Sequence, residues 1–364
     1  MRLAAVLDGI HEQDEAKRLL EAALREEPAH AYLLHGPPGV GKRRAALAFA
    51  GELLGDRDRV ERMTHPDLYL LEPLGDQIRI DDIRLLHHDL HMRPFEADRR
   101  VYLILSAHVM NEDAADALLK DLEEPPPYAV LLLVADELGP LPETIRSRCQ
   151  LVPFRRLPER AVRAEIAARA PGLSEEETTA LARVAGGRLD RAGRLLDPKA
   201  ADRRRRLLEV ARAVYSDPEL EAAGAAGALL EGVTECGVEA KAAAESGLER
   251  LELPAREAEQ RVRRAQRGAE REELLLTLEE LAAWYRDLVV VDTGAEGAVI
   301  HYDRLDVLRE DASGERSPGA ERAAELVRDT WRSLEEFNLH PGLALEALFI
   351  RLRRELAGAA APAG

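Results

Sequence analysis

The chain has 364 residues, more than one hydrophobic core usually organises, so two or three domains are expected. Ala, Leu, Glu and Arg are abundant and aromatic residues make up only 4% of the chain, which favours helical packing units over a β-sandwich. The formal net charge of -17 excludes a protein that coats nucleic acid by bulk attraction, because that role needs a basic surface.

Cysteine usage and the lack of long apolar runs indicate a cytoplasmic protein. Cys149 and Cys236 are the only cysteines, too few for a disulfide framework and without the spacing of metal ligands. The apolar run near the N-terminus is too short for a secretory signal, and no stretch has the roughly 18 apolar residues that cross a bilayer. We therefore expect a cytoplasmic location and no membrane contact.

The first predicted elements are an amphipathic helix over residues 13–24 and a short strand that begins at Ala31. This strand leads into a glycine loop with the Gly-x-x-x-x-Gly-Lys spacing of a phosphate-binding loop, in which bare backbone N–H groups wrap a phosphate chain and the lysine neutralises charge. The residues that match this pattern are Gly36, Gly39, Gly41 and Lys42. Arg43 stands where a Ser or Thr would bind magnesium, so the loop keeps its cradle and lacks its metal ligand.

Short apolar strands then alternate with helices up to residue 157. The strands are predicted at residues 68–71, 100–105, 130–135 and 150–154. Such alternation predicts a parallel sheet with helices on both faces. Leu105 and Ser106 end one of these strands, where phosphate-loop ATPases carry carboxylates that hold magnesium and orient water. Since neither side chain can do this, the isolated chain is not expected to be an ATPase.

Several motifs resemble segments of one known family. The segments 111–126, which ends in Glu-Glu-Pro-Pro, and 144–150, which contains Ser-Arg-Cys, are similar to segments of bacterial clamp-loader subunits. His-Ala-Tyr at 30–32, His-Pro-Asp at 65–67 and Ile-Asp-Asp-Ile-Arg at 80–84 occur in the same order as in that family. The chain therefore resembles the AAA+ clamp-loader subunits of DNA polymerase III, most of all the delta-prime group.

The resemblance implies a role for Arg148, which lies between Ser147 and Cys149 in the Ser-Arg-Cys motif. It would be an arginine finger that braces ATP on a neighbouring motor subunit, a contribution worth roughly 10³ to 10⁵ in rate. The alternative is an arginine that pairs with an acidic surface residue. Cys149 is expected to be a buried structural thiol rather than a nucleophile.

The function implied by the resemblance is that of a non-hydrolysing stator subunit of the DNA polymerase III clamp loader. Its expected partners are gamma/tau-like motor subunits and the delta subunit, and through them a sliding clamp, which the complex loads onto primed DNA. The alternatives are an active gamma/tau-like ATPase motor and a nucleotide-gated adaptor that acts on some other substrate.

No cofactor is expected to be required. The degenerate loop is expected either to hold ATP or ADP without hydrolysis or to serve only as a rigid turn. Residues 52–64 lack the cysteines of the zinc module found in many relatives, so no zinc is predicted. His87, His88 and His91 lie close together on a predicted helix, and His87 and His91 share one face. With no further ligand in view, we expect a solvated helix face and no metal site.

The predicted fold is an α/β AAA+ phosphate-loop domain followed by a small helical lid and an all-α collar. The expected segments are the core at 1–157, a three-helix lid at 158–200, the collar at 201–356 and a disordered tail at 357–364. In the third lid helix the family presents a sensing arginine to the nucleotide. The register we favour places Asp190 there, but Arg188 and Arg191 flank it and leave another register open.

Overall fold

The computed structural model describes residues 12–73, 77–248, 255–313, 315–337 and 339–357. The chain divides into two compact units, Met1–Glu165 with Gly186–Arg191, and Ile166–Ala185 with Ala192–Gly364. The predicted lid, 158–200, is therefore shared between the two units. Most of the predicted tail lies outside the described residues, and its first residue, Ala357, ends a helix.

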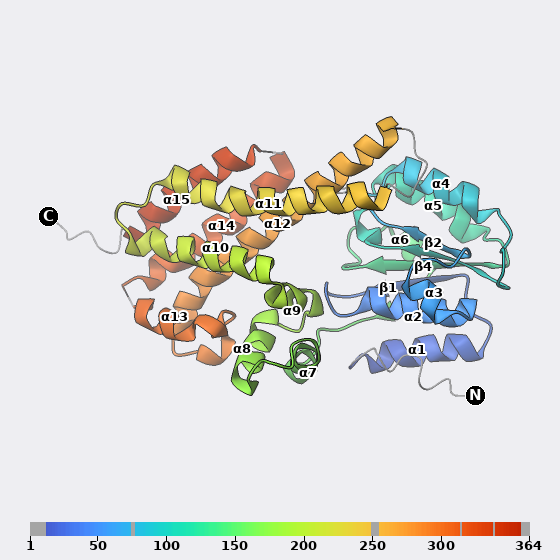
Figure 1. Cartoon of the computed structure of the whole chain (residues 1–364), viewed down its shortest axis with the longest axis horizontal. Coiled ribbons are helices and arrows are strands. Elements are labelled where there is room, and N and C mark those ends of the chain that lie inside the picture. Colours follow the sequence, from blue (N-terminus) through green and yellow to red (C-terminus); the bar gives the residue numbers. More distant parts are fainter. Residues whose placement is uncertain (1–11, 74–76, 249–254, 314, 338, 358–364) are drawn as a thin grey trace. The chain divides into compact units, whose positions relative to one another are not determined.

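The first unit is built on a five-stranded parallel sheet (Figure 1). Its strands are β1 (Ala31–His35), β2 (Leu68–Leu71), β3 (Arg100–Ile104), β4 (Ala129–Ala135) and β5 (Gln150–Pro153). Their order is β2-β3-β4-β1-β5, so β1 lies between β4 and β5. Each predicted strand is present to within one residue at either end, and the predicted parallel sheet is confirmed.

Helices cover both faces of this sheet, as parallel strands require. On one face lie α1 (Asp14–Arg25), α2 (Lys42–Leu54) and α3 (Arg57–Glu61). On the other lie α4 (Ile80–Leu90), α5 (Glu112–Glu123) and α6 (Glu143–Arg146). Successive residues of a strand point to opposite faces. Along β1, Tyr32 and Leu34 join one core while Leu33 joins the other.

A buried carboxylate in this unit orders a loop beside the sheet. Asp67 precedes β2 and is fully buried. Its carboxylate accepts backbone N–H bonds from Phe95 at 2.6 Å and from Glu96 and Ala97 at 2.9 Å. The aspartate of the His-Pro-Asp motif therefore holds the loop that leads into β3.

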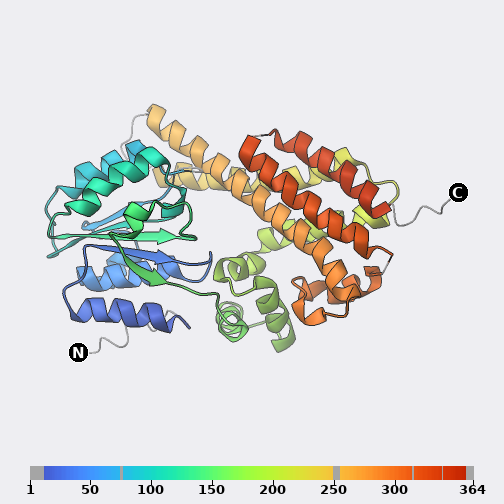
Figure 2. The ribbon, with the colours of Figure 1, turned by 180° about the vertical axis from the view of Figure 1, so that it is seen from behind.

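Three short helices follow the sheet: α7 (Glu159–Arg169), α8 (Glu175–Ala185) and α9 (Leu189–Leu196). The second unit continues with α10 (Pro198–Ser216), α11 (Ala222–Leu248), α12 (Ala255–Asp292), α13 (Leu305–Asp311), α14 (Ser317–Phe337) and α15 (Pro341–Ala357). Figure 2 shows α12, α14 and α15 side by side. Trp284, Tyr285 and Phe349 are the largest fully buried side chains of one continuous core here.

The second unit is thus the helical region that the sequence predicts after the sheet domain. Among the residues that the structure describes, no helix has both the length and the apolar character needed to cross a bilayer.

Candidate phosphate-binding loop and Arg148

The glycine loop joins the carboxyl end of β1 to the first residue of α2. Gly36, Gly39 and Gly41 have φ angles of 140°, 70° and 96°, a region that side chains other than glycine disfavour. A Cβ atom at Gly36 would also lie 2.1 Å from the carbonyl oxygen of Phe154. The loop therefore has the backbone geometry of a phosphate cradle, with the amino end of α2 directed towards it.

Lys42, the first residue of α2, is satisfied within the protein. Its side chain is 4% exposed, and its Nζ donates to the carbonyl oxygens of Gly36 and Pro37. Nζ also lies 2.8 Å from Oδ1 of Asp136. Burial lowers the pKa of Lys42, and the hydrogen bond to Asp136 opposes this shift. An incoming phosphate must therefore exchange with contacts that the lysine already makes.

Asp136 and His108 belong to this site, and sequence reasoning missed both. Asp136 directly follows β4, the neighbour of β1, so parallel pairing carries its carboxylate to the loop. Its backbone N–H donates to Nδ1 of His108 at 3.2 Å. Burial lowers the pKa of His108, although the charge of Asp136 acts the other way. The signal available in the sequence was an acidic residue immediately after a buried strand.

Arg43, Leu105 and Ser106 occupy the positions compared above with the magnesium ligands of ATPases. Nη1 of Arg43 lies 2.6 Å from Oε1 of Glu72, and both side chains are about half exposed. Leu105 is buried beyond the end of β3, and Ser106 turns the chain with a φ angle of 52°. A cation therefore stands at the loop where a hydroxyl would coordinate the metal.

The first turn of α9 packs directly on the loop. The backbone N–H of Leu189 donates to the carbonyl oxygen of Gly39 at 2.6 Å. A Cβ atom at Gly39 would lie only 1.7 Å from Oδ1 of Asp190, so this carboxylate rests against the glycine. Arg188 contacts the same carboxylate at 2.9 Å.

The charge of Asp190 is maintained at this position. Burial alone would raise the pKa of Asp190, but the hydrogen bond from Arg188 offsets this and holds the pKa below its usual range. The structure therefore places both Asp190 and Arg188 beside the loop, with the carboxylate against Gly39. The carboxylate touches Gly39, so its negative charge disfavours a phosphate chain in the cradle, although the ion pair with Arg188 cancels part of this effect.

Arg148 lies between α6 and β5. Its Nη2 lies 2.6 Å from Oε1 of Glu123, and its Nη1 donates to the carbonyl oxygen of Thr144 at 3.0 Å. The side chain remains 35% exposed. The hydroxyl of Ser147 donates to the same carbonyl at 3.1 Å. Burial raises the pKa of Cys149 to about 12, so its thiol stays protonated and is a poor nucleophile.

The loop and Arg148 lie at opposite ends of the sheet. Strands β1 and β5 are parallel, with Tyr32 opposite Gln150 and His35 opposite Pro153. The loop follows His35, whereas Arg148 precedes Gln150. The length of β1, roughly 13 Å at the usual rise per residue, therefore separates them. The structure does not bring Arg148 to the phosphate loop of its own chain.

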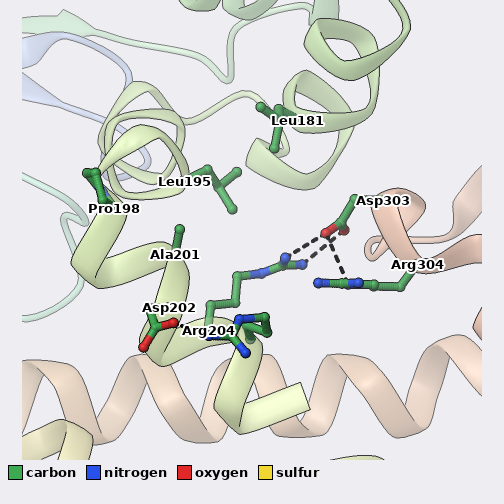
Figure 3. A pocket seen from close by; sticks show the side chains of 9 residues that line it. Leu181, Leu195, Pro198, Ala201, Asp202, Arg204, Asp303 and Arg304 are labelled. Atoms are coloured by element: carbon green, nitrogen blue, oxygen red, sulfur yellow. Dashed lines mark hydrogen bonds and ion pairs between the residues drawn. The ribbon is translucent and has the colours of Figure 1, made fainter. Parts of the chain in front are cut away.

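A pocket of about 360 Å³ in the second unit is lined mainly by charged side chains that pair with one another. Figure 3 shows Arg204 and Arg304 directed at the carboxylate of Asp303. Arg204 makes two hydrogen bonds to Asp303, at 2.7 and 3.1 Å, and a third to Glu280 at 3.1 Å. This arrangement stabilises the junction of α8 and α10 with the turn before α13.

The sequence is similar to subunits of DNA polymerase III. The family described as DNA polymerase III, delta subunit, matches residues 12–158. The chain is 37% identical over 203 residues to the DNA polymerase III subunit delta' of Pseudomonas aeruginosa, covering 51% of this chain and 61% of that protein. It is 34% identical over 158 residues to the delta' subunit of Bacillus subtilis, covering 40% and 48% respectively.

A solved structure resembles nearly the whole chain. It is the crystal structure of a DNA polymerase III gamma subunit-related protein from Thermotoga maritima, 19% identical, with a TM-score of 0.50. The alignment covers 94% of this chain and 99% of that one, and this likeness concerns the fold alone. Subunits named tau and gamma also match the sequence.

The sheet, the glycine loop and the helical second unit define an AAA+ phosphate-loop domain followed by a helical region. Together with the family match over residues 12–158 and the delta' matches, these features support a clamp-loader subunit of DNA polymerase III. The resemblance predicted from the sequence motifs is confirmed. The chain spans 61% and 48% of the lengths of the two delta' relatives.

Proposed function

We propose that this chain is a stator of the DNA polymerase III clamp loader, a subunit that does not hydrolyse ATP but supplies Arg148 to the nucleotide of a neighbouring motor subunit. The observation that carries this proposal is the separation of Lys42 and Arg148 by the length of β1. Arg148 is partly exposed and lies just before the start of β5, which suits it to a phosphate bound by another chain.

The composition of the chain's own loop supports the same role. Arg43 is paired with Glu72, and Leu105 and Ser106 replace the carboxylates that hold magnesium and orient water. Asp190 places a negative charge against the cradle. Nucleotide binding is therefore weak and hydrolysis is lost, so the chain needs no cofactor of its own.

The partners follow from the family. We propose gamma/tau-like motor subunits and a delta subunit as direct neighbours, held through the helical second unit. The complete ring then opens a sliding clamp and places it on primed DNA. The chain works in the cytoplasm as part of the polymerase holoenzyme.

An active motor role is the second candidate, because the glycines and Lys42 of the loop are all present. The isolated chain and the reconstituted complex separate the two. On the stator proposal the isolated chain has no magnesium-dependent ATPase activity, and Arg148→Ala slows turnover by the complex without preventing assembly. Magnesium-dependent turnover by the isolated chain that Lys42→Ala abolishes would establish the motor role instead.

Arg155→Ala is a matched control for this experiment. Arg155 follows β5 at the opposite end from Arg148, is 82% exposed, and pairs with Glu15 at 3.2 Å. Arg155 therefore forms a surface ion pair with a glutamate, as Arg148 does, but has no proposed role in ATP turnover. If both arginine variants change turnover of the complex equally, or neither does, the finger role of Arg148 is wrong.

A further inference from the structure

Helices α4 and α5 pack against each other on one face of the sheet (Figure 1). This packing brings two histidines and an aspartate together. The potential ligand atoms of His87, His91 and Asp121 all lie within 4.8 Å of one another. Nδ1 of His87 is 2.6 Å from Oδ1 of Asp121. The rings of His87 and His91 meet edge to face, with their centroids 4.7 Å apart.

The sequence places these groups by simple helical geometry. His87 and His91 are four residues apart, at the end of α4, and so share one face. Asp121 lies in the last turn of α5 and is 34 residues from His87 in the chain. The two histidines alone predicted a solvated face, because only the packing of α4 on α5 supplies the carboxylate.

Asp121 provides an independent indication of a ligand. It is 2% exposed, and its Oδ2 atom is buried with no hydrogen-bond partner among the described residues. A buried carboxylate oxygen without a partner is costly and uncommon in folded proteins. His87 and His91 are exposed, so the histidine side of this cluster faces solvent.

We propose that His87, His91 and Asp121 form a binding site for a divalent transition-metal ion, with Zn²⁺ as the preferred ion. Two imidazoles and one carboxylate suit zinc and its neighbours, whereas calcium and magnesium favour oxygen-only sets. Three protein ligands leave a fourth tetrahedral position for water. Ligand atoms in such a site are about 3.3 Å apart, so the exposed His91 side chain moves inward when the ion binds. The ion also replaces the hydrogen bond of 2.6 Å between His87 and Asp121, and the proton of that bond is released to water.

The ion cross-links the end of α4 to the end of α5. It supplies the partner that Oδ2 of Asp121 lacks and fixes the start of the loop that leads from His91 into β3. Because binding favours the folded chain, the ion stabilises this face of the sheet. The site is separate from the phosphate loop, and it does not depend on the proposed stator role.

The test is zinc binding by the full chain after treatment with a chelator, followed by titration calorimetry and thermal unfolding. The matched control is His88→Ala, which removes an exposed imidazole from the adjacent position of α4. We expect one ion per chain, a rise in melting temperature with Zn²⁺, and no rise with Mg²⁺. His87→Ala, His91→Ala and Asp121→Asn should each lower the zinc affinity at least about tenfold, while His88→Ala leaves it unchanged.

His91→Ala keeps the test decisive if Asp121→Asn does not fold, since His91 is exposed. Circular dichroism without metal should be the same for His91→Ala and for the original chain. The proposal is wrong if zinc binds less than stoichiometrically, if His91→Ala binds it as tightly as His88→Ala does, or if Mg²⁺ gives the same stabilisation. A cobalt-substituted chain that lacks the absorption of a tetrahedral site would also contradict it.

Discussion

The guanidinium of Arg148 is held by the carboxylate of Glu123, with Nη2 2.6 Å from Oε1. Glu123 lies at the end of α5 and is 51% exposed, so water screens this pair. Such a pair orients the arginine but adds little to folding stability, because exposed ion pairs contribute only about 0–1 kcal/mol to the free energy of unfolding. The guanidinium can therefore leave the glutamate when a phosphate is offered.

This relationship predicts a small stability effect at Arg148. Arg148→Ala, Glu123→Ala and the double variant should give a coupling energy below about 1 kcal/mol in a double-mutant cycle. The measurement is urea unfolding of the isolated chain, with Arg155→Ala as a comparison for an exposed arginine. A coupling of several kcal/mol would instead make the pair a structural salt bridge and weaken the case for a finger.

The carboxylate of Asp190 should weaken nucleotide binding by the loop. Asp190→Asn removes a carboxylate that rests on Gly39, so repulsion of a bound phosphate chain falls. We expect nucleotide affinity to rise roughly tenfold, the order of one partly screened charge interaction. Titration with a fluorescent ADP analogue measures it, and Asp81→Asn, at a side chain 83% exposed on α4, is the control.

If Asp190→Asn binds nucleotide no better than the original chain, the carboxylate does not limit access to the cradle. An equal gain in Asp81→Asn would show a general effect of net charge instead. On the stator proposal, neither variant should hydrolyse ATP, because neither change introduces a magnesium ligand.

The sequence predicted the strands and the loop well because both depend on local patterns. Apolar runs predict buried strands, and the spacing of the glycines predicts the loop. The structure has these glycines at positive φ angles. The approach of Asp136 to Lys42 depends on the order of the strands in the sheet. The hydrophobic pattern of the sequence predicts where strands lie but not their order. Likewise, the contact between Asp190 and Gly39 depends on how α9 returns to the sheet domain.

The cluster of His87, His91 and Asp121 could be predicted from the sequence only in part, because it depends on tertiary packing. His87 and His91 could be placed on one face from their spacing, but the approach of Asp121 from α5 could not. Local chemistry at Arg148 was predicted as two alternatives, an ion pair and a finger. The structure contains the ion pair with Glu123, and the pair is weak enough to be compatible with the proposed finger.

Acid sensitivity is predicted at Asp67. Burial alone would raise the pKa of Asp67, but three backbone N–H donors outweigh burial and hold the pKa below its usual range. The stabilising effect of its charge is therefore fully present above the unfolded-state pKa, about 3.9, and is lost as pH falls through the lower folded-state pKa.

The variant Asp67→Asn should be less stable than the original chain at pH 7 by about 1–3 kcal/mol. The difference should begin to shrink below about pH 4, where Asp67 of the unfolded chain becomes protonated, and shrink further as pH falls through the lower folded-state pKa. Urea unfolding at both pH values measures it. A difference that is the same at pH 7 and at pH 3 would mean that the charge of Asp67 does not contribute.

Arg204 and Arg205 are neighbours on α10 and should contribute unequally to stability. Figure 3 shows Arg204 with its partner Asp303. Arg204 is 13% exposed and joins Asp303 to Glu280, which are 19% and 14% exposed. Its hydrogen bond offsets the effect of burial and keeps the pKa of Asp303 below its usual range. Arg204→Ala leaves two partly buried carboxylates without this partner, so we expect a loss of about 3–5 kcal/mol in the free energy of unfolding.

Arg205 is the matched control, one residue further along the same helix. It pairs with Asp202 and Glu209 but is 54% exposed, so Arg205→Ala should leave the free energy of unfolding nearly unchanged. Urea unfolding followed by tryptophan fluorescence reports on this unit, because Trp284 lies in its core. Equal losses in the two variants would mean that burial of the Arg204 pairs does not set their strength. The predicted difference arises because water screens Arg205 and its partners, whereas the protein surrounds Arg204 and the two carboxylates that it joins.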